Sequence, residues 1–351
     1  MYSKLGVSAD KGGVRRAVSR LDAGLVPGAF CRIVPSLDGD ASRATVMHAD
    51  GVGTKAALAL RHWRLAGNPD VWRWLAQDAV AMNLNDMACV GAVDRIAFTC
   101  TINRNTRVVT DDVVAHLIDG VDTVLRRLSD SGVTVWNSGG ETADVPSLVT
   151  GLTVDASACA LIDRESVIDN SRVKAGDVIV GISSIAGGRG SGIGCNGLTL
   201  AAHQLLTDSS AAADIEPLLT PTPLLTPLVA RLTHRLPGRI NGMAHITGGG
   251  LTKLLHCFVN HRIVIDSPMP VPPIFSRIAD TLNRDWRQMY AVFNMGQLMA
   301  VAVNPVDAQI VKDIAGQAGF DARFIGRIAD AGQSARALDV ATPAGVVTYT
   351  L

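Results

Sequence analysis

The sequence of 351 residues has few aromatic side chains and no excess of charge of either sign. Its 5 Trp, 3 Tyr and 7 Phe are too few to suggest the stacking surface that binds single-stranded nucleic acid. Lys plus Arg and Asp plus Glu both number 32, so the formal net charge is zero. A surface that wraps a polyanion needs a basic excess. We therefore expect no nucleic-acid partner.

Cysteine pairs and long apolar runs are also missing. The six cysteines include no CxxC pair, so a zinc ribbon is excluded and reduced core thiols are expected. No apolar stretch reaches the ~18 residues of a membrane-spanning helix, because Asp155 interrupts the best candidate, residues 148–162. Residues 1–15 contain no apolar segment typical of a secretory signal. We expect a cytoplasmic protein with no membrane partner.

The length and apolar content are typical of a two-domain globular protein. At roughly 150 residues per domain the chain predicts about two domains, and 48% hydrophobic residues exclude a disordered chain. A charge-rich segment, residues 163–177, predicts a boundary near residue 170. Apolar periodicities on both sides predict alternating strands and helices. The predicted strands are 45–48, 95–102, 133–136, 152–162, 178–184, 239–246, 292–303 and 322–328; the predicted helices are 72–90, 110–128, 198–206, 251–256 and 305–318.

The first candidate for chemistry is the segment Asp50-Gly51-Val52-Gly53-Thr54-Lys55, which follows a predicted strand. Its two glycines allow backbone N–H groups to approach an anion. Lys55 can place a charge on a phosphate, and Asp50 can hold Mg²⁺. The spacing is not that of a Walker A loop. Taken alone, the local pattern favours an ordinary turn.

Carboxylates occur at two further element ends. Asp86 follows Asn85 near the end of the helix predicted over 72–90, and Glu141 follows the glycine turn Gly139-Gly140. A helix cap and a tight turn are the alternative interpretations of these segments. Hard oxygen ligands beside turns suit a Mg²⁺ ion that bridges nucleotide phosphates. The sequence therefore suggests a metal set of Asp50, Asp86 and Glu141.

Two glycine-rich loops lie in the second half. The loop 187–197 ends in Asn196-Gly197 and opens a predicted helix, whose N-terminal N–H groups favour phosphate. The second loop, Thr247-Gly248-Gly249-Gly250, follows a strand that ends near His245. A histidine can transfer protons near neutral pH, although a structural role is the alternative for a single histidine beside a strand.

Six blocks of the sequence, in this order, resemble the aminoimidazole ribonucleotide synthetase (phosphoribosylformylglycinamidine cyclo-ligase) family of purine biosynthesis. Each block is weak alone, and their order over most of the chain makes the resemblance strong. The blocks are Asp50 to Lys55, Asp78 to Met82 with Asn85-Asp86, Gly139 to Ala143, Asn196-Gly197, Ala244 to Gly250, and Met289-Tyr290 with Phe293 to Gly296.

The resemblance implies an α/β (α+β) protein of two domains. Residues 1–170 would form an N-terminal ATP- and Mg²⁺-binding domain that pairs with its copy into a β-barrel across a homodimer. Residues 171–351 would form a C-terminal α/β domain that holds the substrate.

The implied reaction is an ATP-dependent C–N ligation. ATP phosphorylates the formyl amide oxygen of formylglycinamidine ribonucleotide, and a substrate nitrogen then closes the imidazole ring and expels phosphate. Such chemistry depends on positioning and charge neutralisation. The implied catalytic residues are Lys55 and His245; the implied ATP site is Asp50, Gly51, Gly53, Thr54, Lys55, Asn85, Asp86, Gly139, Gly140 and Glu141; the implied substrate site is Asn196, Gly197, Thr247, Gly248 and Gly249; the implied Mg²⁺ ligands are Asp50, Asp86 and Glu141.

Departures from the family pattern fall mainly on the substrate side. The His-Ser-Asn-Gly run of the family reads Gly194-Cys195-Asn196-Gly197 here, so its histidine is missing, and Pro223 stands where the family has the arginine of a Pro-Thr-Arg segment. That arginine could have bound a phosphate bidentately. Two alternatives therefore stay open: a paralogue that phosphorylates another small substrate with the same ATP site, and a non-catalytic ATP-binding dimer.

Overall fold

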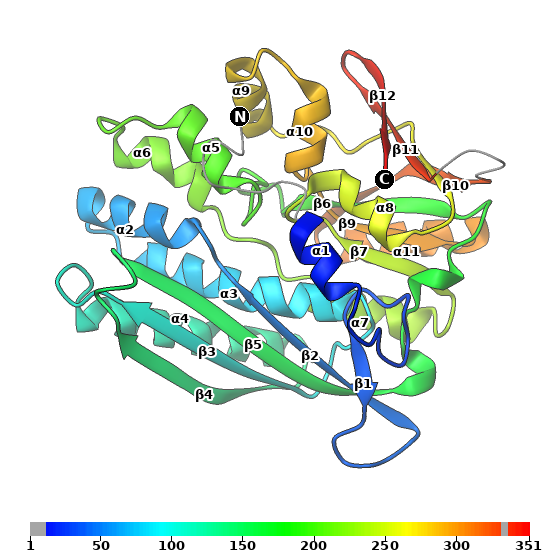
Figure 1. Ribbon diagram of the computed structural model, residues 1–351, viewed down its shortest axis with the longest axis horizontal. Helices are drawn as coiled ribbons and strands as arrows, with labels where there is room; N and C mark the ends of the chain where they lie inside the picture. The colour runs from blue at the N-terminus through cyan, green and yellow to red at the C-terminus, as the bar shows by residue number, and fades with distance from the viewer. Residues whose placement is uncertain (1–11, 331–335) are drawn as a thin grey trace.

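The computed structural model describes residues 12–330 and 336–351 and shows two sheets with helices packed against them (Figure 1). The strands of the first sheet end at Asp163, and those of the second begin at Val178. The predicted boundary at residue 170 lies in the segment between them. Residues 1–11 of the predicted N-terminal domain lie outside the described residues.

The first half forms a five-stranded sheet in the order β1-β2-β5-β3-β4. Helices α3 and α4 pack against one face, and the other face carries no helix in Figure 1. Pairing is antiparallel except between β3 and β4, which run parallel. The elements are α1 (Gly12–Val18), β1 (Ile33–Pro35), β2 (Arg43–Gly51), α2 (Lys55–Ala66), α3 (Asp70–Ala88), β3 (Ile96–Arg104), α4 (Asp111–Asp130), β4 (Val135–Asp144) and β5 (Leu152–Asp163).

Helix α3 differs from an ordinary surface helix because it is buried on nearly all sides. Fifteen of its 19 residues are buried, since the sheet covers one side and the second domain covers another. Helix α4 is amphipathic, and only its apolar stripe is buried. The burial of α3 explains how polar residues such as Asp78, Asn85 and Asp86 lie in the interior of the molecule.

Strand β4 runs through the segment that the sequence predicts to be a glycine turn. Its pairing with β3 shifts register between Phe98 and Cys100, and Gly139 there has φ +86°. A Cβ on Gly140 would lie 2.1 Å from the Cys100 carbonyl oxygen. The two glycines therefore serve an irregular strand pairing in which the backbones approach closely, and the predicted turn at residues 138–141 is wrong.

The second half forms a seven-stranded sheet in the order β12-β11-β8-β10-β6-β9-β7. Its strands are β6 (Val178–Ala186), β7 (Ile240–His245), β8 (Arg262–Ile265), β9 (Gln297–Val303), β10 (Phe320–Ala329), β11 (Ala337–Thr342) and β12 (Gly345–Thr350). Its α-helices are α5 (Leu198–Leu205), α6 (Ala212–Ile215), α7 (Thr226–Arg235), α8 (Leu254–Cys257), α9 (Pro273–Thr281), α10 (Trp286–Val292) and α11 (Pro305–Gln317). Short 3₁₀-helices are η2 (Arg164–Ser166), η3 (Asn170–Arg172), η4 (Glu216–Leu219) and η5 (Gly250–Lys253).

The strand predicted over 292–303 begins five residues later than expected. Residue 292 instead ends α10, which starts where the Asp285 side chain accepts a hydrogen bond from the Gln288 backbone N–H. An aspartate that caps a helix in this way favours helix over strand for the residues that follow. The apolar run therefore divides between the end of α10 and β9.

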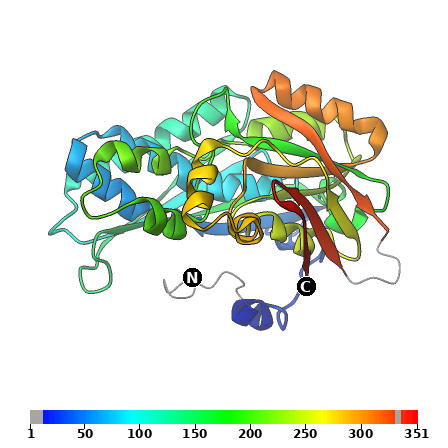
Figure 2. The ribbon, with the colours of Figure 1, turned by 90° about the horizontal axis from the view of Figure 1, so that it is seen from above.

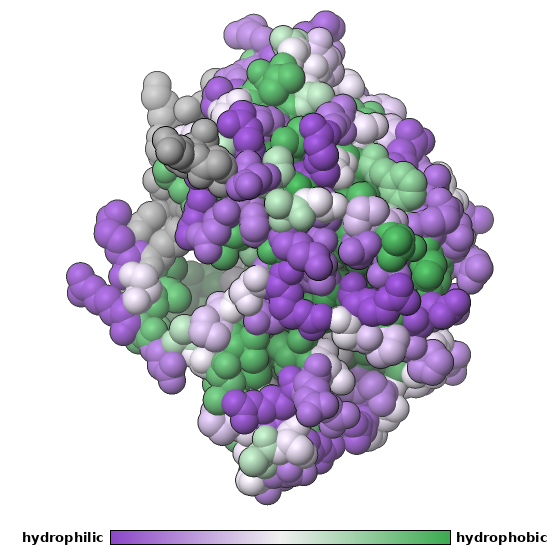
Figure 3. All heavy atoms as spheres, turned by 90° about the vertical axis from the view of Figure 1, so that its right-hand side faces the viewer, coloured by the Kyte–Doolittle hydropathy of each residue, from purple (hydrophilic) through white to green (hydrophobic). Residues whose placement is uncertain are grey.

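No helix among residues 12–330 and 336–351 is long and apolar enough to cross a membrane. Figure 3 shows the side that lies at the right of Figure 1, where hydrophilic residues predominate and hydrophobic groups gather in small patches.

A buried polar contact joins the two domains along α3. The Lys55 ammonium lies 2.6 Å from Asp78 Oδ2 and donates to the Thr220 carbonyl at 2.6 Å. The other Asp78 oxygen accepts the backbone N–H and the hydroxyl of Thr222, at 2.8 and 2.7 Å. Asn85 donates to the Pro223 carbonyl and accepts the Leu225 N–H. We call this set of contacts to residues 220–225 the interdomain clamp.

The clamp predicts a large effect of removing the Lys55 charge. Replacing one partner of a buried ion pair leaves the other charge buried and unpaired, so we expect Lys55→Met to lower the free energy of unfolding by about 3–5 kcal/mol. Urea unfolding followed by circular dichroism measures this change. The control is Lys174→Met, because Lys174 is exposed. Equal midpoints for the two variants would contradict the structural role of Lys55.

Candidate functional site

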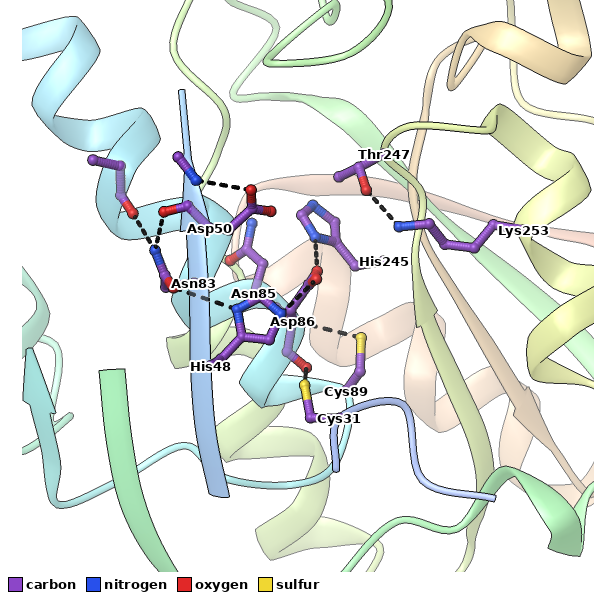
Figure 4. A network of polar contacts seen from close by, with 12 residues as sticks. Cys31, His48, Asp50, Asn83, Asn85, Asp86, Cys89, His245, Thr247 and Lys253 are labelled. Carbon is purple, nitrogen blue, oxygen red and sulfur yellow. Dashed lines mark hydrogen bonds and ion pairs between the residues drawn. The ribbon is translucent and has the colours of Figure 1, made fainter. Parts of the chain in front are cut away.

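A network of polar side chains lies where β2, α3 and β7 meet (Figure 4). The Asp86 carboxylate of α3 lies between two histidines: Oδ1 is 2.6 Å from His245 Nδ1, and Oδ2 is 3.3 Å from His48 Nε2. His48 also contacts Asn83, whose amide donates to the Asp50 carbonyl at 3.1 Å. The network therefore links the ends of two strands from different domains through one buried helix.

The two histidines fix the charge of Asp86. Burial alone would raise its pKa, but hydrogen bonds from His245 and His48 outweigh burial and hold the pKa well below its usual range. The reverse holds for His48: burial would lower its pKa, but the hydrogen bond and charge of Asp86 outweigh it and raise the pKa. Asp86 is therefore ionised at neutral pH, and it favours a protonated His48.

His245 has a defined tautomer as a consequence. An ionised carboxylate accepts and cannot donate, so His245 Nδ1 carries the proton that Asp86 accepts. In the neutral imidazole this leaves Nε2 as the acceptor nitrogen. That nitrogen is buried and has no hydrogen-bond partner among the described residues. His245 therefore holds a free proton-acceptor position next to the network.

Asp50 lies at the end of β2 and is the first residue of the Asp50–Lys55 segment. Its Oδ1 accepts the Gly51 backbone N–H at 2.8 Å. Solvent reaches much of this side chain, yet the surrounding protein removes enough water to raise its pKa, and the nearby Asp86 charge adds to the shift. A cation at this position would relieve the repulsion. Gly53, at φ +53°, faces open space, so an anion can approach its backbone.

Lys253 is a residue of the site that the sequence did not reveal. It ends η5, directly after the glycine loop 247–250. Its ammonium donates to Thr247 Oγ1 and lies 5.3 Å from the centre of the Phe30 ring. Its charge also lowers the pKa of both Asp50 and Asp86. A lysine three residues after a glycine loop was the only available signal.

Three residues expected at the ATP site instead hold the domains together. Lys55 is fully buried and its ammonium is taken up by the clamp, so it does not point to a phosphate in this structure. Asn85 is likewise buried, and its side-chain amide forms hydrogen bonds with the backbone of Pro223 and Leu225. Thr54 Oγ1 contacts Thr199 Oγ1 of the second domain at 2.6 Å. Backbone groups of the segment remain, but its lysine has a structural role.

Glu141 lies apart from the other two expected Mg²⁺ ligands. It pairs with Thr101, which pairs with Asp155, which pairs with Gly51, so three strand spacings, about 14 Å, separate Glu141 from Gly51. The pairing also places Glu141 on the face of the sheet without helices, whereas His48 and Asp50 point toward α3. Within one chain, Gly139, Gly140 and Glu141 are not part of the network.

The residues expected to bind substrate divide into two groups. Asn196 accepts the Asn294 backbone N–H at 2.6 Å, and a Cβ on Gly197 would lie 2.4 Å from the Phe293 ring. Both therefore fix the packing of the loop 187–197. By contrast, Thr247 contacts Lys253, Gly248 faces open space, and Gly249 has φ +92°. Only the second group lies next to the network.

The network suits Mg²⁺ only together with a ligand that brings its own oxygens. No group of three or more His, Cys, Asp or Glu side chains within residues 12–330 and 336–351 is arranged to hold a metal ion. Mg²⁺ in phosphate-transfer sites commonly takes one or two carboxylates and completes its shell with phosphate oxygens and water. Asp50 uses Oδ1 to accept the Gly51 N–H, which leaves Oδ2 for a cation, and Asp86 Oδ2 has only the longer contact to His48. These two carboxylates fit such an ion.

The contacts of Asp86 predict how His48 titrates. We expect Asp86→Asn to lower the His48 pKa from above to below 6.5, because burial then acts without the opposing charge. The raised pKa stabilises the fold below the unfolded-state pKa of about 6.5, and this contribution is lost as pH rises through the folded-state pKa.

Histidine NMR titrations of the metal-free protein measure both values. His116 and His234 lie on α4 and α7 and serve as internal controls, because neither contacts Asp86. An unchanged His48 pKa in Asp86→Asn would show that the contact does not govern His48.

Comparisons with known proteins agree with this architecture. Residues 22–162 match the model of the AIR synthase related protein N-terminal domain, and residues 174–339 match that of the corresponding C-terminal domain. Phosphoribosylformylglycinamidine cyclo-ligase of Methanocaldococcus jannaschii is 32% identical over 302 residues, which cover 81% of this chain and 78% of that protein. The enzyme of the same name from Methanococcus maripaludis strain C6 is 31% identical over 301 residues, with the same coverage.

A solved structure shows the same fold. The structure of a HypE–HypF complex superimposes with a TM-score of 0.65 at 17% identity, over 97% of this chain and 99% of that one. At this identity the likeness concerns the fold alone. The two family models and the cyclo-ligase relatives together show that the chain belongs to the AIR synthase related protein family, with its two-domain fold.

Proposed function

We propose that the protein is an ATP-dependent cyclo-ligase that closes formylglycinamidine ribonucleotide to aminoimidazole ribonucleotide. The observation that carries this proposal is the match across both domains to relatives that bear the cyclo-ligase name. The reaction would move the terminal phosphoryl group of ATP to the formyl amide oxygen. A substrate nitrogen would then attack that carbon, and the C–O bond to phosphate would break, leaving ADP, phosphate and the new ring.

The network supports this chemistry by placing opposite charges at one edge of the fold. Asp50 and Asp86 are the proposed Mg²⁺ ligands, and the Mg²⁺ would neutralise charge on the phosphates that it bridges. Lys253 supplies the cation that Lys55 cannot, and it lies next to Thr247, Gly248 and Gly249. We therefore assign phosphate contact to Lys253 and to the backbone of the loop 247–250.

His245 is the proposed proton acceptor. The hydrogen bond from its Nδ1 to Asp86 fixes the orientation of the ring, and in the neutral ring it leaves Nε2 as the acceptor. The ring closure releases a proton from the attacking nitrogen, and Nε2 can accept it. Because Nε2 is buried, this role requires the neighbouring loop to move when substrate enters.

We also propose that the active form is a homodimer in the cytoplasm. The face of the first sheet without helices carries Met47, Cys159, Ala97 and Trp136 in one row across four strands. Met47 is 66% exposed and Trp136 is 53% exposed, and a second copy would cover this apolar row.

A paralogue with another substrate is the second candidate. Gly194 and Pro223 replace the histidine and arginine of the family pattern on the substrate side, and Pro223 belongs to the clamp. A phosphoryl acceptor other than the purine precursor would explain both replacements while the charged network is kept.

The decisive measurement is ADP release by the purified protein with Mg²⁺–ATP, in the presence and absence of formylglycinamidine ribonucleotide. We expect ADP release that depends on the substrate and is matched by aminoimidazole product. Asp50→Asn should weaken Mg²⁺–ATP binding about tenfold or more, because it removes one charged ligand.

The outcomes separate the candidates. Nucleotide binding without product favours the second candidate. Absence of Mg²⁺–ATP binding would contradict both, and unchanged affinity in Asp50→Asn would remove Asp50 from the site.

A lysine variant tests the assignment of the phosphate contact. We expect Lys253→Met to raise the KM for ATP about tenfold, because it removes a charge-assisted hydrogen bond. Lys253→Arg should keep most of the affinity, since it keeps the charge. The matched control is Lys312→Met, because Lys312 lies on α11, outside the network. Equal KM values for Lys253→Met and Lys312→Met would contradict the assignment of the phosphate contact to Lys253.

A further inference from the structure

A cleft lies between the two domains, away from the polar network. It has a volume of about 1110 Å³ and is lined by residues of α3, α4, α7, α11 and the loop after β6. In Figure 2 the helices α4 (teal) and α11 (orange) lie along the upper side of the molecule, while α1 (blue) lies along the lower side. The cleft is large enough for a ligand of nucleotide or sugar-phosphate size.

Helix α3 separates this cleft from the network. Gln77 lines the cleft, and Asp86, nine residues later, belongs to the network. At 3.6 residues per turn, nine residues make two and a half turns, so the two side chains leave α3 on opposite sides. No residue of the network lines the cleft.

Three arginines from both domains line the cleft. Arg127 comes from α4, Arg189 from the loop after β6, and Arg231 from α7. No carboxylate of the described residues lies within 4.0 Å of any of these guanidinium groups, although Asp130 and Glu216 also line the cleft. The side-chain oxygen of Gln77 accepts from Arg127 at 3.2 Å and so orients it. The three arginines outnumber the two carboxylates of the lining, so the cleft carries a net positive charge and none of its arginines is in an ion pair with a described residue.

A buried hydroxyl completes the polar lining. Ser184, at the end of β6, is only 3% exposed and lines the cleft. Its Oγ has no hydrogen-bond partner among the described residues. Solvent does not reach this Oγ, which faces Gly192, so the groups of the cleft that can meet a ligand are the three arginines. A phosphate group supplies several acceptor oxygens and two negative charges, and guanidinium groups bind it bidentately.

We propose that this cleft binds the phosphate group of a phosphorylated small molecule, held by Arg127, Arg189 and Arg231. Because the arginines come from both domains, the bound molecule bridges them next to the clamp, whose residues Thr220 and Pro223 also line the cleft. The site stands on its own geometry and does not depend on the proposed ligase activity.

Isothermal titration calorimetry of the full chain tests this site in the absence of ATP and Mg²⁺. The probes are inorganic phosphate and ribose 5-phosphate, with ribose as the uncharged control. We expect both phosphates to bind and ribose not to bind. Arg189→Gln and Arg231→Gln should each weaken binding about tenfold, the effect of one charge-assisted hydrogen bond.

The matched control is Arg277→Gln, because Arg277 lies on α9 and does not line the cleft. It should bind both phosphates like the unaltered chain. Equal weakening by Arg277→Gln would indicate attraction to surface charge in general and would overturn the proposal. Unchanged affinity in the double variant Arg189→Gln, Arg231→Gln would overturn it as well, since any phosphate then binds elsewhere. Binding of inorganic phosphate but not ribose 5-phosphate would show a site for the free ion only, against the proposal of a phosphorylated ligand.

Discussion

The buried ion pair between Lys55 and Asp78 is the interaction on which the arrangement of both sites depends. A charged pair removed from water is stable only with good geometry and further hydrogen bonds. Thr220 and Thr222 provide these bonds from the second domain. The pair is therefore satisfied only when the two domains are docked. Docking in turn brings Asp86 on α3 against His245 on β7, and it forms the walls of the arginine cleft.

The distribution of charges around α3 follows from this arrangement. One side of the helix uses its polar groups to hold the second domain, through Asp78 and Asn85. Another side carries Asp86, whose carboxylate contacts the two histidines of the network. Because each carboxylate already has partners, neither is an uncompensated charge in the interior. The cations that remain free for a ligand, Lys253 and the three cleft arginines, lie at the margins of the fold.

Many helices and strands of the fold were predicted from the sequence, because apolar periodicity and the positions of glycines depend on residues that are near one another in the chain. The helix around Asp86 was predicted within two residues of its observed bounds, the strand predicted over 45–48 forms the middle of β2 (Arg43–Gly51), and the two-domain fold of the family is confirmed. Gly139 and Gly140 were misread as a turn because the close approach of Cys100 comes from a strand 40 residues away. Local pattern cannot reveal such a contact.

The candidate site was less predictable for the same reason. The segment Asp50–Lys55 has the composition of an anion-binding loop, and nothing nearby in sequence shows that Asp78 and Thr220 will enclose its lysine. Lys253 was missed because its significance arises only when the second domain places it near Asp50 and Asp86. Residues whose partners lie 140 to 165 positions away take their roles from tertiary structure. Composition and spacing therefore suggest such residues, but the packing decides between structural and chemical roles.

The clamp also has a consequence for synthesis of the chain on the ribosome. The first sheet is complete once β5 ends at Asp163, but the partners of Lys55 and Asp78 lie at residues 220–222. At about 5–20 residues per second, roughly 3–12 s pass between the emergence of these two segments. During that interval Lys55 and Asp78 lie on a surface of the first domain that the second domain does not yet cover, and water must solvate both. The late arrival of a short proline-flanked segment thus determines when the nascent chain can bury its central helix.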